Sequence, residues 1–505
     1  MKTNPLFADG YKLDHRRQYR KGTQRIFSNF TPRSSKLKNI PDSVFLDRNV
    51  CFGVQYFCKA FLIDLWNREF FQRPKDEVVR AYKRRIDNYL GPDAVPVEHI
   101  AELHDIGYLP IEIRALPEGT LYNYRVPMLT IHNTDDRCFW LPNYLETVLS
   151  NMLWKANITA ATALHYRYLI ESYCKATGGD LNFVKWQGHD FSARGMCGIA
   201  DASICGLAHL LFFTGTDTFT AIDYAEEYYN ANSDNELIGG SVPATEHSVM
   251  SLSGQEDELG TFRRLVTEVY PAGIVSIVSD TWDFWQVMTR FTVELKSEIM
   301  ARGGKLVFRP DSGDPVKIVC GDPDAPFGSP ERDGALECLW KVYGGTTNAA
   351  GYRVLDPHVG LIYGDSITLY RCEAILSRMK EMGFCSTNIV FGIGSFTYQH
   401  VTRDTAGFAM KATYGEVDDV AHNIFKKPKT DSGMKNSAKG LLCVRESDDR
   451  CGFICENEST WERMDELSEL TPVFRDGKLL RDESLATIRA RAEKYLGQLD
   501  KKVVA

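Results

Sequence analysis

The sequence lacks any apolar run long enough to span a lipid bilayer, and it has no excess of positive charge. Among its 505 residues, Asp and Glu number 67 against 59 Lys and Arg, so the formal net charge is -8. A membrane helix needs about 20 mainly apolar residues, and binding to nucleic acid or an anionic membrane needs a positive field. We therefore expect no nucleic-acid partner and no membrane partner. The first residues lack an apolar signal core, so we expect a cytoplasmic protein.

The cysteine pattern argues against two further classes. The 13 cysteines are odd in number and scattered through apolar segments, without paired C-x-x-C spacings. Disulfide frameworks and structural zinc sites need such pairs. The turn at 391–395, FGIGS, matches neither the P-loop nor a complete G-x-G-x-x-G fingerprint. Because the net charge is -8, an anionic ligand must meet a local cluster of basic residues.

One pattern occurs four times between Ile274 and Ser395: a short apolar run, a break at Asp or Gly, and a helical stretch. The first three runs lead to Asp280, Asp311 and Asp365, and the fourth leads to Ser395. Continuous β-branched and aromatic runs of this length are typical of parallel strands buried on both faces. In a β/α barrel the residues that end such strands converge on one mouth. That mouth would suit a metal ion and a phosphorylated sugar.

Three further apolar runs bring the expected number of strands to about seven. They are residues 182–191, 210–216 and 237–244. We predict an α/β fold, with an irregular or incomplete β/α barrel and an additional β-rich domain. The expected division is an N-terminal α+β region at 1–150, a barrel-like catalytic domain at 151–404, and a C-terminal β-rich segment with a final helix at 405–505. The third part would complete the domain that the first part begins.

Other elements are predicted from periodicity and from turn residues. Helices are expected near residues 53–69, 75–89, 160–176 and 482–499, and strands within 109–120 and 126–134. The Pro-, Gly- and Asp-rich stretch at 321–334 is predicted to be a loop inserted between two barrel units.

Asp280 and Asp311 are the candidate metal ligands. They lie 31 positions apart, about one βα unit, and Arg309 is beside the second. Either Asp alone is more simply explained as a helix N-cap. Two at successive strand ends, with Asp365 to follow, favour Mg²⁺, which takes few protein carboxylates together with phosphate oxygens.

Three other motifs have both a functional and a structural interpretation. FGIGS with Arg403 after it suits a phosphate, but it is equally a plain strand-to-helix turn. In GHDFSARG, Phe191 and Arg194 can stack a flat ring and reach an anion; alternatively, Phe191 is core and His189 bonds a backbone carbonyl. In SVPATEHS, a structural histidine is the default interpretation of His247.

Taken together, the motifs resemble those of the nicotinamide phosphoribosyltransferase family. ADGYK, GHDFSARG, GTDT, SVPATEHS, VSD, RPDSGDP, GDS, the Gly turn and VTRD occur in the order and spacing of that family, over nearly the whole chain. The resemblance implies a type II phosphoribosyltransferase with an irregular β/α barrel and an added β-rich domain, active as a homodimer with shared active sites. It also implies the reaction, in which nicotinamide and 5-phosphoribosyl 1-pyrophosphate give nicotinamide mononucleotide and pyrophosphate for NAD salvage.

The resemblance further implies roles for individual residues. Around the pyridine ring these are Phe191, Tyr11 contributed by the second subunit, Arg309 beside the carboxamide, and Asp217 as acceptor of its NH₂, with Ser241 and Ser276 also in the substrate-binding set. Around the sugar and metal they are Asp311 and Asp365 near the ribose, and Asp280 and Asp311 at Mg²⁺. For the 5′-phosphate they are Gly394, Ser395 and Arg403, and for the other phosphates Arg33, Arg194, Lys411, Lys426 and Lys435. His247 matches a histidine that the family phosphorylates with ATP.

One departure and two alternatives belong with this resemblance. Where the family usually has a run of glycines, this chain has Gly394, Ser395 and Phe396, which changes the expected phosphate contact. The basic segment from Lys426 is equally a solvated loop. A nicotinate-type enzyme is one alternative, although the Asp217 carboxylate would repel an anionic base. A non-catalytic barrel that binds a phosphate ligand is the other.

Overall fold

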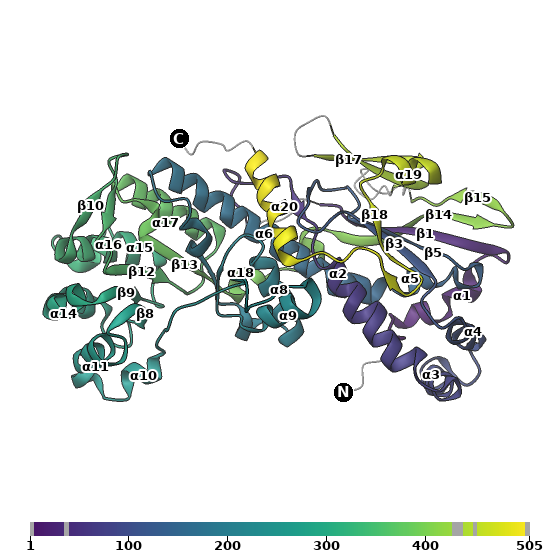
Figure 1. Cartoon of the computed structure of the whole chain (residues 1–505), viewed down its shortest axis with the longest axis horizontal. Coiled ribbons are helices and arrows are strands. Elements are labelled where there is room, and N and C mark those ends of the chain that lie inside the picture. Colours follow the sequence, from purple (N-terminus) through teal and green to yellow (C-terminus); the bar gives the residue numbers. More distant parts are fainter. Residues whose placement is uncertain (1–4, 35–39, 427–437, 448–451, 500–505) are drawn as a thin grey trace.

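The structure is a computed structural model that describes residues 5–34, 40–426, 438–447 and 452–499. Two large sheets lie in the two halves of an elongated molecule, and helices α6 (Glu146–Ala176) and α20 (Leu485–Gln498) lie between them (Figure 1). Helix α6 is buried on every side from Lys155 to Cys174. The sequence predicts this helix only from residue 160, because a helix buried all round has no amphipathic period to mark its start.

Six parallel strands form the sheet of one half. Their order across the sheet is β7 (Gly215–Thr216), β6 (Gly188–Asp190), β13 (Ile389–Ile393), β12 (Val359–Tyr363), β9 (Gly303–Arg309) and β8 (Ala272–Val278). The last four are the strands predicted from the repeated apolar pattern, so that prediction is confirmed. Strand β12 is buried along its whole length, as expected for a strand covered on both faces.

Two of the other three predicted strands are mostly helix or turn. Residues 182–191 contain helix α7 (Val184–Gln187) before the three-residue β6, and residues 210–216 follow helix α8 (Ile199–His209) directly and are extended only at β7. The side chains from Leu210 to Phe213 are buried. A short buried apolar run does not distinguish a helix end from a strand, and the predictions were wrong for this reason.

The third predicted strand, at 237–244, is an irregular segment that connects the two edges of the sheet. Gly240 bridges Gly215 of β7, and Ala244 bridges Ser276 of β8, both in parallel orientation. Backbone hydrogen bonds of 2.9–3.0 Å support both bridges. The predicted α/β fold with an irregular barrel is therefore confirmed, although one of its expected strands is reduced to two bridges.

The other half of the molecule contains a seven-stranded antiparallel sheet that takes strands from both ends of the chain (Figure 1). Its order is β15 (Val420–Asn423), β14 (Phe408–Val417), β1 (Thr23–Pro32), β5 (Leu129–Asn133), β3 (Ile111–Ala115), β18 (Thr471–Arg475) and β19 (Lys478–Leu479). Strands β3 and β5 lie within the predicted segments 109–120 and 126–134. The domain limits at 150 and 404 stay a prediction; residue 150 lies inside α6.

Most of the other helices agree with the sequence pattern. The helix expected at 53–69 starts as α2 (Val54–Tyr56) and continues as π-helix to Phe71, and the next is α3 (Lys75–Leu90). The loop expected at 321–334 ends earlier, because helix α16 (Pro330–Tyr343) begins inside it. Within the described ranges, no helix combines the length and the apolar character needed to cross a bilayer.

Candidate active site

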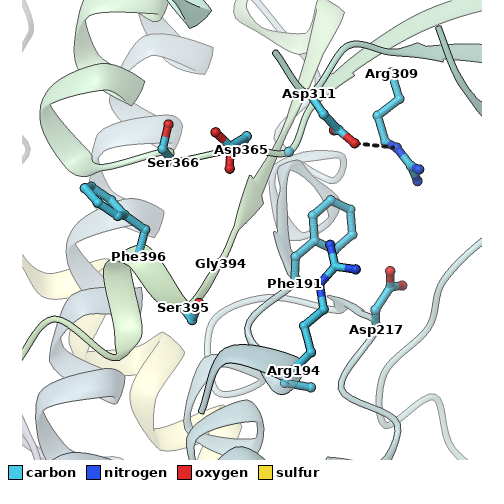
Figure 2. A pocket seen from close by; sticks show the side chains of 12 residues that line it. Phe191, Arg194, Asp217, Arg309, Asp311, Asp365, Ser366, Gly394, Ser395 and Phe396 are labelled. Carbon is cyan, nitrogen blue, oxygen red and sulfur yellow. Dashed lines mark ion pairs between the residues drawn. The ribbon is translucent and has the colours of Figure 1, made fainter. Parts of the chain in front are cut away.

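A cavity of about 540 Å³ lies where the parallel strands end. Its lining combines residues that follow β6, β7, β9, β12 and β13: Phe191, Ala193, Arg194, Asp217, Arg309, Asp311, Gly364, Asp365, Ser366, Gly394, Ser395 and Phe396. Figure 2 shows the Phe191 ring near the middle, with Asp217 and Arg309 on one side and Ser366 and Phe396 on the other. Eight lining residues are among those predicted from the sequence.

Two glycines leave the space that the Phe191 ring occupies. A Cβ on Gly392 would lie 2.4 Å from Cδ2 of the ring, and one on Gly364 would lie 3.0 Å from its Cε2. The backbone N–H of Phe191 donates to the Ile393 carbonyl at 3.0 Å. The ring edge therefore lies against the backbone of the neighbouring strands, and the rest of the ring faces the cavity.

Asp217 is held by two donors. Its Oδ1 accepts hydrogen bonds from His189 Nε2 at 2.9 Å and from Ser241 Oγ at 2.7 Å. Burial raises the pKa of the Asp217 carboxyl, but the hydrogen bonds and charge from His189 and the bond from Ser241 outweigh burial, and the pKa lies below its ordinary value. Asp217 Oδ2 accepts nothing from the described part of the chain. The partner of His189 is thus this carboxylate, and the backbone carbonyl considered from sequence is wrong.

Asp190 is a positioning residue that the sequence analysis missed. Its buried carboxylate accepts from the Ser192 N–H at 2.9 Å and from Thr218 Oγ1 at 2.6 Å, and its carbonyl accepts from the Asp217 N–H at 2.9 Å. Asp190 therefore ties the loop of Phe191 to the loop of Asp217. A carboxylate at the end of a buried strand, beside an aromatic residue, was the available signal, since such a group needs local donors.

Arg309 and Asp311 form an ion pair at the end of β9. Arg309 Nε lies 3.8 Å from Asp311 Oδ2 (Figure 2), and Arg309 Nη2 donates to the Thr245 carbonyl at 2.6 Å. Burial raises the pKa of Asp311; the Arg309 charge lowers it, and the charges of Asp280 and Asp365 raise it again, so the pKa lies above its ordinary value. Carboxylates crowd this part of the cavity.

Asp280 connects the ends of β8 and β9. Its Oδ2 accepts from the N–H groups of Asp311 at 2.8 Å and Ser312 at 2.7 Å, and from Ser312 Oγ at 2.6 Å. Its Oδ1 is buried and has no hydrogen-bond partner among the described residues. Asp280 itself does not line the cavity, but it orients the backbone of Asp311, which does.

The N-cap interpretation of Asp280 and Asp311 is wrong, because other residues cap the helices that follow. Asp283 accepts from the Gln286 N–H at the start of α12 (Phe284–Gln286). Asp314 accepts from two N–H groups at the start of α15 (Pro315–Cys320). Among the described residues, no group of three or more His, Cys, Asp or Glu side chains is arranged to hold a metal ion. A cation here would therefore use one or two carboxylates.

The loops after β12 and β13 form the remaining wall of the cavity. Asp365 is exposed, and Ser366 after it has φ 47°, a left-handed conformation unusual for a residue other than glycine. Gly394 precedes the short helix α18 (Ser395–Tyr398) and makes the predicted strand-to-helix turn. Neither Ser366 nor Phe396 is among the predicted site residues, since only the fold brings them against the cavity.

Other predicted site residues do not line this cavity. They are Tyr11, Arg33, Ser241, His247, Ser276, Asp280, Arg403, Lys411 and Lys426, and Lys435 lies outside the described residues. His247, exposed at the start of α10 (His247–Ser251), has its Nδ1 3.1 Å from Thr281 Oγ1. Ser276 Oγ is buried without a partner in the described part of the chain.

Several of these residues gather beside the antiparallel sheet. Burial lowers the pKa of Lys411 on β14, and the positive charges of Arg33, Lys12 and Arg403 lower it further, against the charge of Glu146. Tyr11 precedes Lys12 in the sequence, and the Nζ atom of Lys12 lies 5.1 Å from the centroid of the Tyr11 ring. The Tyr11 side chain is 66% exposed. Within one chain, the basic cluster and Tyr11 thus lie outside the cavity that contains Phe191.

Residues 186–476, more than half of the chain, match the model of the nicotinate phosphoribosyltransferase (NAPRTase) family. This match and the strand-end cavity define the class of the protein as a phosphoribosyltransferase. Residues 5–113 match the N-terminal domain of nicotinamide phosphoribosyltransferase. A nicotinamide phosphoribosyltransferase from Acinetobacter baylyi is 54% identical over 500 residues, covering 98% of each chain, and one from Xanthomonas campestris is 31% identical over 497 residues, covering 97% of each. The chain therefore belongs to the nicotinamide phosphoribosyltransferase family.

Two solved structures share the fold. The nicotinate-nucleotide pyrophosphorylase from Pyrococcus furiosus has a TM-score of 0.58 at 15% identity and covers 98% of this chain, with 96% of its own chain covered. Human nicotinic acid phosphoribosyltransferase has a TM-score of 0.51 at 14% identity, with 100% of this chain and 96% of its own covered. At these identities the likeness concerns the fold alone.

Proposed function

We propose that this protein transfers the phosphoribosyl group of 5-phosphoribosyl 1-pyrophosphate to nicotinamide, forming nicotinamide mononucleotide and pyrophosphate for NAD biosynthesis. The observation that carries the proposal is one cavity that holds the Phe191 ring, the Asp217 carboxylate and the Arg309–Asp311 pair. The names of the relatives support the same activity. A cytoplasmic location is part of the proposal.

The base-binding end of the cavity suits an uncharged pyridine carboxamide. The Phe191 ring offers an aromatic face. Asp217 Oδ2, which accepts no hydrogen bond within the described ranges, can accept from the carboxamide NH₂. Arg309 lies beside them and can donate to the carboxamide oxygen. The pyridine nitrogen already carries a lone pair, so no general base is required to create the nucleophile.

Replacing Gly392 by Ala should displace the Phe191 ring, because the new Cβ would overlap it. We expect the KM for nicotinamide to rise roughly tenfold, since a small misplacement of a substrate-positioning group is costly, with a smaller change in the KM for the sugar substrate. Gly303→Ala on β9 is the control, because its Cβ would meet only Ala272 Cβ at 4.0 Å. Steady-state kinetics with each substrate varied would test this, and equal effects of the two substitutions would contradict it.

The sugar end of the cavity suits cleavage at the anomeric carbon. The bond from that carbon to the pyrophosphate oxygen breaks and a bond to the pyridine nitrogen forms, through a state with oxocarbenium character. The carboxylates of Asp311 and Asp365 stabilise the positive sugar. Arg194 and the turn at Gly394 and Ser395 supply donors for phosphate oxygens.

Mg²⁺ is part of the proposal. Asp280 Oδ1 is buried and has no partner among the described residues, and the Asp311 carboxylate lies near those of Asp280 and Asp365; both features fit a cation that uses few protein oxygens. Asp280 and Asp311 would hold it, and when bound it neutralises negative charge on the pyrophosphate leaving group. ATP is proposed as a phosphoryl donor to His247, whose exposed ring is accessible to it.

We also propose a homodimer with shared sites. Tyr11, Arg33, Arg403 and Lys411 lie outside the cavity of their own chain, and in a dimer they can complete the cavity of the second subunit. Lys426 and Lys435 would add positive charge to the same phosphates. The proposal makes the isolated subunit incomplete for both the base and the pyrophosphate.

Mixing Tyr11→Ala protein with Phe191→Ala protein should restore activity that each lacks alone, because the heterodimer contains one intact site. About half of the subunits would enter heterodimers after random exchange, so recovery should approach a quarter of the wild-type activity, a rough figure from one intact site in two. Two Phe191→Ala samples mixed together are the control. No recovery after confirmed subunit exchange would rule out sharing.

An assay of pyrophosphate release and mononucleotide formation tests the proposed function, with nicotinamide and nicotinate as parallel substrates. We expect turnover with nicotinamide and much less with nicotinate. Turnover with nicotinate alone would favour the acid-using alternative, and no turnover with either base would favour a non-catalytic phosphate-binding barrel.

A further inference from the structure

Arg371 does not line the cavity, but it contacts two segments that do. It lies in the first turn of helix α17 (Leu369–Glu381). Its Nη1 donates to the Ser366 carbonyl at 2.6 Å, and its guanidinium carbon lies 5.9 Å from the centroid of the Phe396 ring. A guanidinium at this distance from an aromatic face is attracted to it. Arg371 thus joins the loop after β12 to the turn after β13.

Both contacts of Arg371 fall on unusual residues. Ser366 is left-handed at φ 47°, a conformation that costs free energy and needs support from its surroundings. Phe396 occupies the turn in which glycines are expected, and 45% of its side chain is exposed. Its ring also lies 4.7 Å from the His400 ring, centroid to centroid. Without Arg371 and His400, the Phe396 ring would have more freedom at the edge of the cavity.

A second connection joins the same two segments. Thr397 Oγ1 donates to the Ile367 carbonyl at 2.6 Å, and the Tyr166 hydroxyl donates to that carbonyl at 3.2 Å. Thr397 belongs to α18, one residue after Phe396, and Ile367 follows Ser366. The two loops are therefore joined at two successive carbonyls, those of Ser366 and Ile367.

We propose that Arg371 is a positioning residue that couples the ribose carboxylate of Asp365 to the 5′-phosphate turn at Ser395, with the Phe396 ring as its platform. The inference rests on the proposed function, since it assigns Arg371 to the sugar-phosphate substrate and not to the base. Where the family has a flexible glycine run, the contact between Arg371 and Phe396 holds this part of the cavity lining in one position. It therefore sets the separation between the groups that hold the two ends of the phosphoribosyl unit.

Arg371→Gln removes the guanidinium fork and should raise the KM for 5-phosphoribosyl 1-pyrophosphate about tenfold, the scale of losing one charge-assisted contact. The KM for nicotinamide and the Tm should change little, because the base lies at the other end of the cavity. Arg371→Lys keeps the charge and one donor and should give an intermediate value. Arg378→Gln is the matched control, since Arg378 lies on the same helix and its side chain pairs with Glu381 at 3.0 Å, away from the cavity lining.

A double-mutant cycle with Phe396→Gly tests the route of the coupling. If Arg371 acts through the ring, Arg371→Gln should raise the KM less in the Phe396→Gly background than in wild type. If the two substitutions raised the KM by independent, multiplicative factors, that route would be overturned. The inference itself would be overturned by an unchanged KM for the sugar substrate in Arg371→Gln. It would also be overturned if the KM rose equally for both substrates and the Tm fell. Absence of wild-type turnover would instead refute the proposed function, and thermal stabilisation by ribose 5-phosphate would then still measure the phosphate contact.

Discussion

Exhaustive chelation of divalent cations is expected to abolish nicotinamide mononucleotide formation, and added Mg²⁺ to restore it. The departing pyrophosphate carries several negative charges, and the end of the cavity that it leaves from already holds the carboxylates of Asp311 and Asp365. Without a cation, these charges repel one another in a partly desolvated site. The Asp280 Oδ1 atom is buried without a partner in the described residues, and we propose that it would bind such a cation together with Asp311. Full turnover after chelation would contradict the metal proposal.

Substitutions should locate this requirement at the strand ends. Asp311→Asn should lower kcat/KM by roughly 100-fold and raise the Mg²⁺ concentration needed for half-maximal rate, since one charged ligand is lost. Asp314→Asn is the matched control, because Asp314 caps α15 three residues further on and Asn is an equally good cap. The control should retain near-normal turnover. Equal Mg²⁺ dependence in the two variants would place the cation elsewhere.

The raised pKa of the Asp311 carboxyl predicts how Mg²⁺ binding depends on pH. Burial and the nearby charges of Asp280 and Asp365 raise the pKa of Asp311 above its ordinary value. Asp311 is therefore protonated at a higher pH than a solvated Asp, and its protonated form is a poor ligand. The Mg²⁺ concentration for half-maximal rate should rise as the pH falls toward that pKa.

Asp217→Asn is expected to narrow the preference for nicotinamide over nicotinate by at least about tenfold in the ratio of kcat/KM values. Nicotinate would bring its own negative charge against the Asp217 carboxylate, and like charges at a binding surface cost several kcal/mol. Because about 1 kcal/mol already changes a ratio about fivefold, even a partly screened repulsion is measurable. The hydrogen bonds from His189 and Ser241 outweigh burial and hold the pKa of Asp217 below its ordinary value, so burial does not neutralise this carboxylate.

The design of this variant leaves the local structure in place. An Asn side-chain oxygen can still accept from His189 Nε2 and Ser241 Oγ, which lie 2.9 and 2.7 Å from Asp217 Oδ1. The NH₂ that replaces Oδ2 removes the charge and also the proposed acceptor of the carboxamide NH₂, so nicotinamide use should weaken as well. Asp223→Asn on the exposed face of α9 (Thr220–Tyr229) is the matched control. If wild type used nicotinate as well as nicotinamide, or if the ratio were the same in Asp217→Asn, the acid-using alternative would take precedence.

The sequence by itself determined the strands of the repeated pattern and the residues that end them. Strand β12, most of β13 and the second half of β8 are buried in the sheet, and the apolar runs of all four strands are continuous. The polar residue that stops each run therefore lies at or just after the strand end. For this reason the sequence alone places Asp311, Asp365 and Ser395 at the ends of apolar runs. The ordered motifs added Phe191 and Asp217, which also line the cavity.

Only the tertiary structure decided which of these groups meet and what holds them. The segment that bridges β7 and β8 shows no hydrophobic periodicity in the sequence, because each bridge involves a single residue pair. The hydrogen bond from His189 to Asp217 and the contact of Arg371 with Phe396 join residues 28 and 25 positions apart, and no local pattern encodes such pairs. Likewise, Asp283 rather than Asp280 caps α12 because backbone geometry, and not residue type, determines which carboxylate reaches the free N–H groups.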